Sequence, residues 1–204
     1  MQVENLVVRS PVDPLDRLNP ELQRRYQMTD HQVSSLLEGA ERIALKGGEH
    51  WLRPGEAADF FLLMIDGVSR IYRVDDEGTE TTRVFYFAGQ WGAPWGESLR
   101  GLASRSFGQA MTPMTALKIP LSWVEKRAET ELPWARFMRR LIQEAYLVKE
   151  AREHEFLTAS ATQRYLDLIR SEPRLMEYVS LQTLATYLGI TPVALSRIRG
   201  RLSN

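Results

Sequence analysis

The segment from Leu181 to Asn204 restricts the fold more than any other part of the sequence. Thr191 offers a hydroxyl that can cap a helix, and Pro192 suits the first helical position, where a missing N–H costs nothing. Just before them, Gly189 can end a helix in the left-handed conformation without a Cβ penalty. The residues ahead of this turn repeat with the spacing of one buried helix face: Leu181, Leu184, Ala185 and Leu188. We therefore expect two short helices joined by a tight turn.

The second of these helices has an apolar side and a basic side. Its inward residues at helical spacing are Leu195, Ile198 and Leu202, and no Asp or Glu occurs from Ser180 to the end of the sequence. This layout is typical of a helix-turn-helix whose second helix enters the major groove of double-stranded DNA. The alternative is an ordinary helical hairpin with a basic face. The predicted DNA-binding residues are those of the basic side and of the cap: Thr191, Val193, Ser196, Arg197, Arg199 and Arg201.

The charge of the whole chain gives no sign of nucleic-acid binding, because 26 Lys and Arg residues balance 26 Asp and Glu residues. The basic residues matter locally, near the C-terminus. The 204-residue sequence has no cysteine, which excludes disulfides, thiolate zinc sites and cysteine-ligated iron–sulfur clusters. No apolar run approaches the about 20 residues of a membrane span, and the N-terminus lacks the layout of a signal peptide. These features predict a cytoplasmic protein with no membrane partner.

The middle of the chain, after Gly39, consists of short segments rich in β-branched and aromatic residues. Turn residues separate them, and this regular spacing indicates an antiparallel β-sandwich or β-roll. Asp66-Gly67 and residues 76–78 are expected hairpin turns. Before Gly39 we expect an irregular lead-in up to about Pro20, then helices at 21–27 and 29–38, with Thr29 as an N-cap. The expected strands are 42–46, 50–52, 60–65, 68–74, 79–87, 106–111 and 115–119.

A long helix is expected from Pro133, because no Gly or Pro interrupts the sequence again until Pro173. Ser160 and Gln163 form a capping-box sequence, which places a joint before the C-terminal helices. The apolar residues of the long helix alternate at three and four positions, as in a coiled-coil seam: Met138, Leu141, Ala145 and Val148. This seam predicts a homodimer. The alternative is that the same face packs on its own sheet.

A β-roll, a long helix and a C-terminal helix-turn-helix thus follow one another. Their order and several short sequence matches resemble the cyclic-AMP receptor and fumarate-nitrate reductase regulator (Crp/Fnr) family from about Thr29 onward. The resemblance implies an α+β fold: a cyclic-nucleotide-binding-like β-roll (jelly roll) at 1–132, a dimerisation helix at 133–158 and a DNA-binding domain at 159–204. It also implies a homodimeric transcription regulator, and it leaves RNA polymerase open as a partner. The matches are Lys46-Gly47-Gly48-Glu49, Pro54-Gly55-Glu56, the run from Phe61 to Tyr72, Gly96-Glu97-Ser98-Leu99 and the run from Ala103 to Phe107.

In that family a Gly-Glu pair followed by Arg-Ser forms a cassette that holds a cyclic phosphate. Carried over residue by residue, the resemblance assigns tentative effector-binding roles to the matching positions. A helix N-terminus and an arginine suit a phosphate, and a glutamate can accept a ribose hydroxyl. The cassette residues are Gly96, Glu97 and Ser98 in the first part, and Arg105 and Ser106 in the second.

Two departures disfavour a cyclic nucleotide as the effector. The spacing from Glu97 to Arg105 is shorter than in the cyclic-AMP receptor. The stretch from Trp134 to Phe156 also lacks the Ser and Thr hydroxyls with which that receptor reads adenine. Trp91 and Trp95, beside the cassette, can fill the pocket instead. We therefore assign no cofactor, and we expect the roll either to act as a scaffold or to bind another small-molecule effector.

The predicted recognition helix departs from the cyclic-AMP receptor as well. Arg197 matches the guanine-reading arginine of that receptor, but Pro192 and Val193 stand where it has Arg and Glu. The half-site preference of the receptor is therefore not carried over.

Other classes of function lack the residues that they need. Haem would need an axial ligand, and His50 is the only candidate in the predicted roll. A cupin-like enzyme would need clustered His and carboxylate ligands, whereas His31, His50 and His154 belong to three different predicted elements. We expect neither a catalytic site nor a metal site. The remaining alternative is a cyclic-nucleotide-binding regulatory module without DNA binding, which leaves the basic second helix unexplained.

Overall fold

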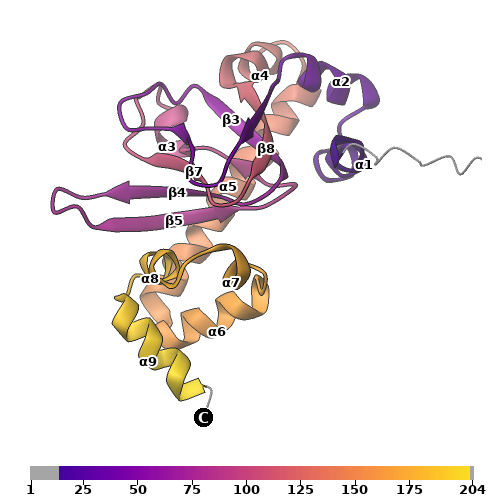
Figure 1. Cartoon of the computed structure of the whole chain (residues 1–204). Helices are drawn as coiled ribbons and strands as arrows, with labels where there is room; N and C mark the ends of the chain where they lie inside the picture. The colour runs from indigo at the N-terminus through magenta and orange to yellow at the C-terminus, as the bar shows by residue number, and fades with distance from the viewer. Residues whose placement is uncertain (1–13, 203–204) are drawn as a thin grey trace, which may run out of the picture.

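The computed structural model describes residues 14–202, and these form an N-terminal β-roll flanked by helices and a C-terminal group of helices below it (Figure 1). The predicted α+β class and the antiparallel roll are confirmed. One sheet has the strand order β1 (Glu41–Leu45), β8 (Met114–Pro120), β3 (Phe60–Asp66) and β6 (Trp91–Gly92). The other has the order β2 (His50–Leu52), β7 (Phe107–Ala110), β4 (Ser69–Val74) and β5 (Glu80–Tyr86). All pairs of neighbouring strands are antiparallel.

One of the two expected hairpins is correct and the other is wrong. Residues 75–79, which include the expected turn at 76–78, join β4 to its neighbour β5. The N–H of Gly78 donates to the carbonyl oxygen of Asp75 at 3.0 Å. Asp66-Gly67 instead leads from β3 in one sheet to β4 in the other. Gly67 has a φ of 84°, and a Cβ there would lie 2.3 Å from the carbonyl oxygen of Pro113. Gly67 therefore forms a turn, as its sequence predicts, but this turn crosses between the sheets.

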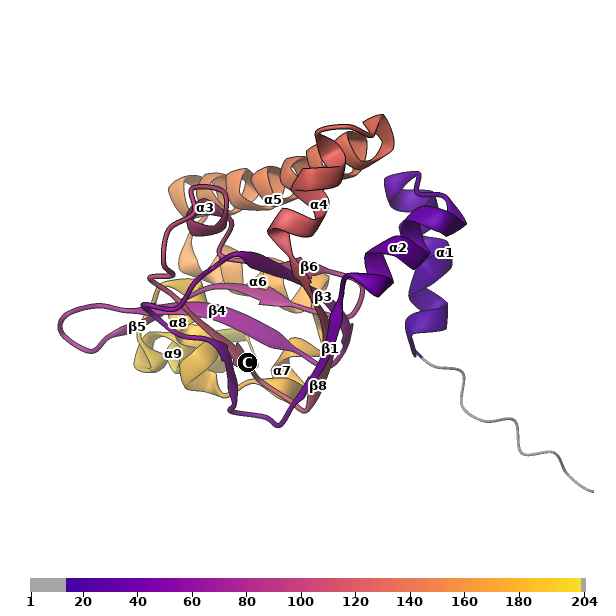
Figure 2. The ribbon, with the colours of Figure 1, turned by 90° about the horizontal axis from the view of Figure 1, so that it is seen from above.

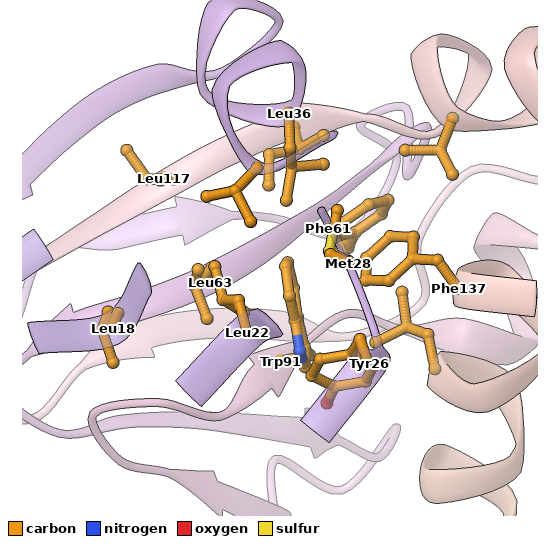
Figure 3. Close-up of a cluster of buried hydrophobic side chains, with 14 of the residues drawn as sticks. Leu18, Leu22, Tyr26, Met28, Leu36, Phe61, Leu63, Trp91, Leu117 and Phe137 are labelled. Atoms are coloured by element: carbon orange, nitrogen blue, oxygen red, sulfur yellow. The ribbon is translucent and has the colours of Figure 1, made fainter. Parts of the chain in front are cut away.

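The outer face of the first sheet is covered by α1 (Pro14–Tyr26), α2 (Asp30–Glu38), α4 (Leu121–Ala128) and α5 (Leu132–Thr158). Figure 2 shows α4 and α5 on one side of the roll, with α1 and α2 beside them. The alternating residues of β3 supply the sheet side of this core, and Phe137 supplies part of the α5 side (Figure 3). The labelled side chains of the cluster are Leu18, Leu22, Tyr26, Met28, Leu36, Phe61, Leu63, Trp91, Leu117 and Phe137.

The N-terminal helices differ in part from expectation. The helix α1 begins at Pro14, so an irregular chain up to Pro20 is wrong for residues 14–20, while residues 1–13 lie outside the described part. For α2 the Thr29 cap is confirmed. Its hydroxyl accepts from the N–H of Gln32 at 3.2 Å, and the Gln32 side chain accepts from the Thr29 N–H at 2.8 Å. The reciprocal pair makes a complete capping box.

The interior of the roll is filled by apolar side chains from both sheets. Leu62 and Met64 of the first sheet meet Ile71 and Ala110 of the second, and all four are at most 3% exposed. At one end of the roll lies the short helix α3 (Trp95–Ser98), which carries most of the cassette.

The C-terminal part consists of α6 (Ala161–Ser171), α7 (Leu175–Tyr178), α8 (Leu181–Leu188) and α9 (Pro192–Leu202). The predicted N-cap of α6 is confirmed, because the Ser160 hydroxyl accepts from the N–H of Gln163 at 3.2 Å. The Gln163 side chain bonds Asp167 instead of closing the box. A third core cluster joins these helices to Val68 and Phe85 of the roll. Among the helices of residues 14–202, none is long and apolar enough to cross a membrane.

Candidate nucleic-acid interface and effector cassette

The turn between α8 and α9 has the geometry that its sequence predicts. Gly189 ends α8 in the left-handed conformation, at φ 67° and ψ 35°. The Thr191 hydroxyl accepts from the N–H of Ala194 at 3.2 Å and so caps α9. The two helices share a core in which Leu184, Leu188 and Leu195 are at most 1% exposed. They therefore form one rigid helix-turn-helix.

One side of α9 is exposed and basic. Val193 is 62% exposed, and the remaining predicted DNA-binding residues, Thr191, Ser196, Arg197, Arg199 and Arg201, are exposed as well. At 3.6 residues per turn, Val193, Ser196, Arg197 and Gly200 lie within about 100° of one another around the helix axis. A Cβ on Gly200 would meet no atom within 4 Å, so this side is open. Leu202, in the last turn of α9, was expected to face inward, but it is 46% exposed.

The cassette residues come together at α3, but their polar groups already have partners within the chain. Glu97 is 5% exposed, and its Oε1 accepts from Nη2 of Arg73 at 2.5 Å and from Nε of Arg105 at 3.4 Å. Arg73 also donates through Nε to the Ser106 hydroxyl at 3.0 Å. The Ser98 hydroxyl donates to the carbonyl oxygen of Pro94 at 3.3 Å. A ribose hydroxyl at Glu97 would therefore compete with a charge-assisted hydrogen bond.

Arg73 is the residue of this site that the sequence analysis missed. It belongs to β4, which is separated from the cassette along the chain, and no family match marks it. Burial is the main reason that its pKa is lowered, and the neighbouring positive charge of Arg83 adds to the effect. Arg105 differs in character, since its side chain is 67% exposed. The buried carboxylate is thus neutralised mainly by a residue from the sheet.

The two tryptophans beside the cassette were one possible filling of the effector pocket, but they do not lie inside the roll. Trp91 and Trp95 pack on the outer face of the first sheet, where Trp95 stacks on Phe61 with the ring centroids 6.0 Å apart. The adjacent interior is occupied by Tyr86, which donates to the carbonyl oxygen of Ala93 at 3.4 Å. Burial raises the pKa of this tyrosine. Its ring lies over Gly92, where a Cβ would approach to 2.9 Å.

His50 makes a hydrogen bond within the roll. Its Nε2 lies 2.9 Å from the hydroxyl of Tyr72, whose ring stacks on Phe107 at 4.9 Å. Across residues 14–202, no group of three or more His, Cys, Asp or Glu side chains is arranged to hold a metal ion.

The predicted dimer seam on α5 needs correction. Leu141 is 1% exposed in the single chain, where it belongs to the core on the first sheet, and Met138 packs against the same core. For these two residues the alternative is correct: this face of α5 packs on the sheet of its own chain. Leu141 has almost no surface left for a second copy to contact. Ala145 is partly buried, and Val148 is 59% exposed. Of the four predicted seam residues, only Met138 and Leu141, in the first half of the helix, pack in the core on the first sheet.

No protein-family model and no curated protein matches the sequence. Solved structures do share its fold. The chain resembles CLP of Xanthomonas campestris, a c-di-GMP-responsive global regulator, at 19% identity and a TM-score of 0.67, over 84% of this chain and 90% of that one. It resembles FixK2 of Bradyrhizobium japonicum at 19% identity and a TM-score of 0.68, over 80% and 84%. A candidate transcriptional regulator of the Crp/Fnr family from Eubacterium rectale matches at 16% identity and a TM-score of 0.72, over 92% and 88%.

Proposed function

The chain has the fold of the Crp/Fnr regulators, and on that premise we propose that it is a homodimeric transcription regulator that binds specific DNA sequences. The exposed basic side of α9 is the observation that carries this proposal. From Ser180 onward the chain has no acidic residue, so α8, the turn and α9 carry no negative side chain that would repel phosphates. The alternative, a nucleotide-binding module without DNA binding, gives this surface no role.

The roles of the α9 residues follow from their directions. Arg197 lies one turn beyond Val193 on the open side, where a guanidinium can meet guanine O6 and N7. Thr191 and Ser196 offer hydroxyls near the same groove. Arg199 and Arg201 flank this side, and we assign them to backbone phosphates. The Val193 side chain offers an apolar contact, for which a thymine methyl is the natural partner.

We place the dimer contact on the exposed part of α5, next to the face that packs on the roll. Ile142, Ala145 and Tyr146 are spaced as one side of a helix, and Tyr146 is 64% exposed. Of the predicted seam, this contact keeps Ala145 and replaces Met138 and Leu141, which pack on the roll. It also leaves out Val148, because Val148 points about 160° away from Tyr146 around the helix axis. Paired α5 helices would carry two recognition helices to successive major grooves, about 34 Å apart.

The hydrogen bonds within the cassette bear on which effector the roll can bind. Because Arg73 and Arg105 already hold Glu97, we propose that cyclic AMP is not the effector and that the roll serves as a scaffold or binds another ligand. The proposal includes no catalytic activity. It places the protein in the cytoplasm and leaves RNA polymerase open as a further partner.

A selection from randomised duplex DNA tests the function. The purified full-length protein should enrich an inverted repeat whose half-sites are about one helical turn apart, as expected for a symmetric dimer. The matched control is the Arg197→Ala/Arg201→Ala double variant, which should enrich nothing. Failure of the wild-type dimer to enrich any sequence, at low salt and with nucleotide effectors added, would count against the proposal.

A further inference from the structure

The helix-turn-helix contacts the roll directly as well as following α5 in the chain, because α8 lies against β5 (Figure 1). We call this contact the roll–helix interface. Its residues are Thr82 and Phe85 of β5, Thr186 and Tyr187 of α8, and Arg152 of α5. It has a polar part and an aromatic part.

The polar part is a chain of hydrogen bonds with one consistent direction. Arg70, 5% exposed, donates from Nη1 to the Thr82 hydroxyl at 3.1 Å. The Thr82 and Thr186 hydroxyl oxygens lie 2.7 Å apart. Thr186 in turn donates to the carbonyl oxygen of Thr183 at 2.8 Å. Each hydroxyl has one proton, so Thr82 must donate to Thr186. The chain connects a buried arginine of the sheet to the backbone of α8.

The aromatic part brings three segments of the protein together at Tyr187. Its ring lies 5.0 Å from the ring of Phe85 in the roll, measured between centroids. The guanidinium of Arg152 in α5 lies 3.8 Å from the Tyr187 ring centroid and donates to the Tyr187 carbonyl oxygen. Val68 and Phe85 belong to the same buried cluster as Leu184 and Leu188 of α8. This is a packed contact with specific geometry.

Because α8 and α9 share a buried core, whatever fixes α8 also fixes the direction of α9. The contact uses Thr186 and Tyr187 in the C-terminal half of α8, and it leaves Val193, Ser196 and Arg197 exposed. The docked arrangement therefore does not cover the DNA-binding side.

We propose that the roll–helix interface is a positioning surface: β5 holds α8 so that α9 points in its DNA-binding direction. Thr82, Phe85, Thr186 and Tyr187 are positioning residues that touch no DNA. The inference rests on the proposed function and adds to it, since it assigns control of the recognition helix to a direct contact with the roll. A dimer needs two half-sites read at a fixed separation, so loss of the contact should lower specific affinity.

A disulfide tests the interface, and the chain suits this test because it has no cysteine of its own. The threonine oxygens lie 2.7 Å apart, so cysteine sulfurs at these two positions would be within reach of the about 2.05 Å of an S–S bond. The Thr82→Cys/Thr186→Cys variant should therefore cross-link on mild oxidation. The oxidised protein, locked in the docked arrangement, should bind the selected DNA at least as tightly as the reduced one, which lacks both hydroxyl groups of the interface. The two single-cysteine variants are the controls for oxidation itself.

Two single substitutions weaken the interface without a cross-link. Thr186→Val removes the hydroxyl and keeps the shape of the side chain, and Phe85→Ala removes the ring. Each should weaken binding to the selected DNA by roughly tenfold, while the salt dependence, which reports phosphate contacts, stays unchanged. Circular dichroism and sedimentation should show a folded dimer in both cases. Ser180→Ala is the matched control, since it alters α8 at its cap and leaves the interface intact.

The outcomes are separable. If the cysteine pair does not cross-link, α8 does not dock on β5 in solution and the proposal is wrong. If the oxidised form loses DNA binding that the reduced form shows, the docked arrangement prevents binding, which also overturns it. If the wild type binds no DNA at all, the proposed function fails, and the cross-link then still reports whether the contact exists.

Discussion

The carboxylate of Glu97 in α3 accepts a 2.5 Å hydrogen bond from Arg73 in β4, a residue 24 positions earlier in the chain. This ion pair occupies the acid that the family resemblance assigns to a ribose hydroxyl. A ligand at this acid would have to replace a charge-assisted bond formed inside the protein. The Arg73–Glu97 pair thus decides whether a ligand can bind the Glu97 carboxylate.

Cyclic AMP should not bind the wild-type protein. Because Arg73 already occupies Glu97, calorimetry with the ligand at about 1 mM should give no heat beyond dilution. A Kd above that concentration corresponds to a binding free energy weaker than about 4 kcal/mol. Micromolar affinity would contradict the prediction and would mean that Glu97 exchanges Arg73 for the ribose.

Arg73→Ala should destabilise the protein by about 1–3 kcal/mol, because it leaves a buried carboxylate without its main donor. Arg105→Ala is the matched comparison. Its side chain is 67% exposed and its contact with Glu97 is longer, at 3.4 Å, so it should cost less than about 1 kcal/mol. Urea unfolding of both variants measures the difference. Equal losses would show that the two arginines share the carboxylate.

Arg197→Ala should flatten the sequence preference of the protein, because it removes a guanidinium that reads guanine, at a cost of about 1–3 kcal/mol of discrimination. Arg201→Ala should weaken all DNA sites alike and lower the salt slope by about one unit. Selection from randomised DNA and salt titrations separate the two effects. Equal loss of preference in both variants would place base reading elsewhere on α9.

Tyr146→Glu should convert the dimer to monomers that bind DNA weakly, because it places a charge in the proposed contact between two α5 helices. Leu147→Glu is its control. The two side chains are similarly exposed, at 64% and 60%, but successive residues of a helix point about 100° apart. Sedimentation should find the Leu147 variant still dimeric. The reverse result would move the dimer contact to the other side of α5.

Two glycines of the helix-turn-helix should respond in opposite directions to alanine. Gly189 has a φ of 67°, and a Cβ there would lie 2.7 Å from Cε1 of Phe156, so Gly189→Ala should cost at least about 1–2 kcal/mol. Gly200 lies within α9 with no atom near its missing Cβ, so Gly200→Ala should stabilise the fold by about 0.5–1 kcal/mol. Thermal unfolding of the two variants gives the comparison. Stabilisation by Gly189→Ala would rule out the left-handed turn.

Local patterns in the sequence were sufficient to predict the helix caps and turns, which depend on residues only a few positions apart. The α8 turn follows from Gly189 and the α9 cap from Thr191, and both have the predicted geometry. The N-cap at Thr29 and the hairpin turn at residues 76–78 were also predicted correctly. The predicted capping box at Ser160 is only half formed, because the Gln163 side chain bonds Asp167. Helical periodicity, caps and turns depend on near neighbours, so they can be read without knowing the fold.

Only the tertiary structure decided which partner each surface meets. An apolar periodicity marks Leu141 as inward, but its place in the core on the first sheet makes the chain itself, not a second copy, its partner. Gly67 marks a turn, yet the pairing of the strands makes that turn a crossing between sheets. Thr82 and Thr186, 104 positions apart, meet because the roll and α8 pack together. The sequence by itself determined the caps, the turns and most of the helices and strands, since those depend on backbone preference and side-chain spacing. The partners of Glu97, Leu141 and Tyr187 depend on packing between distant segments, which no local spacing encodes.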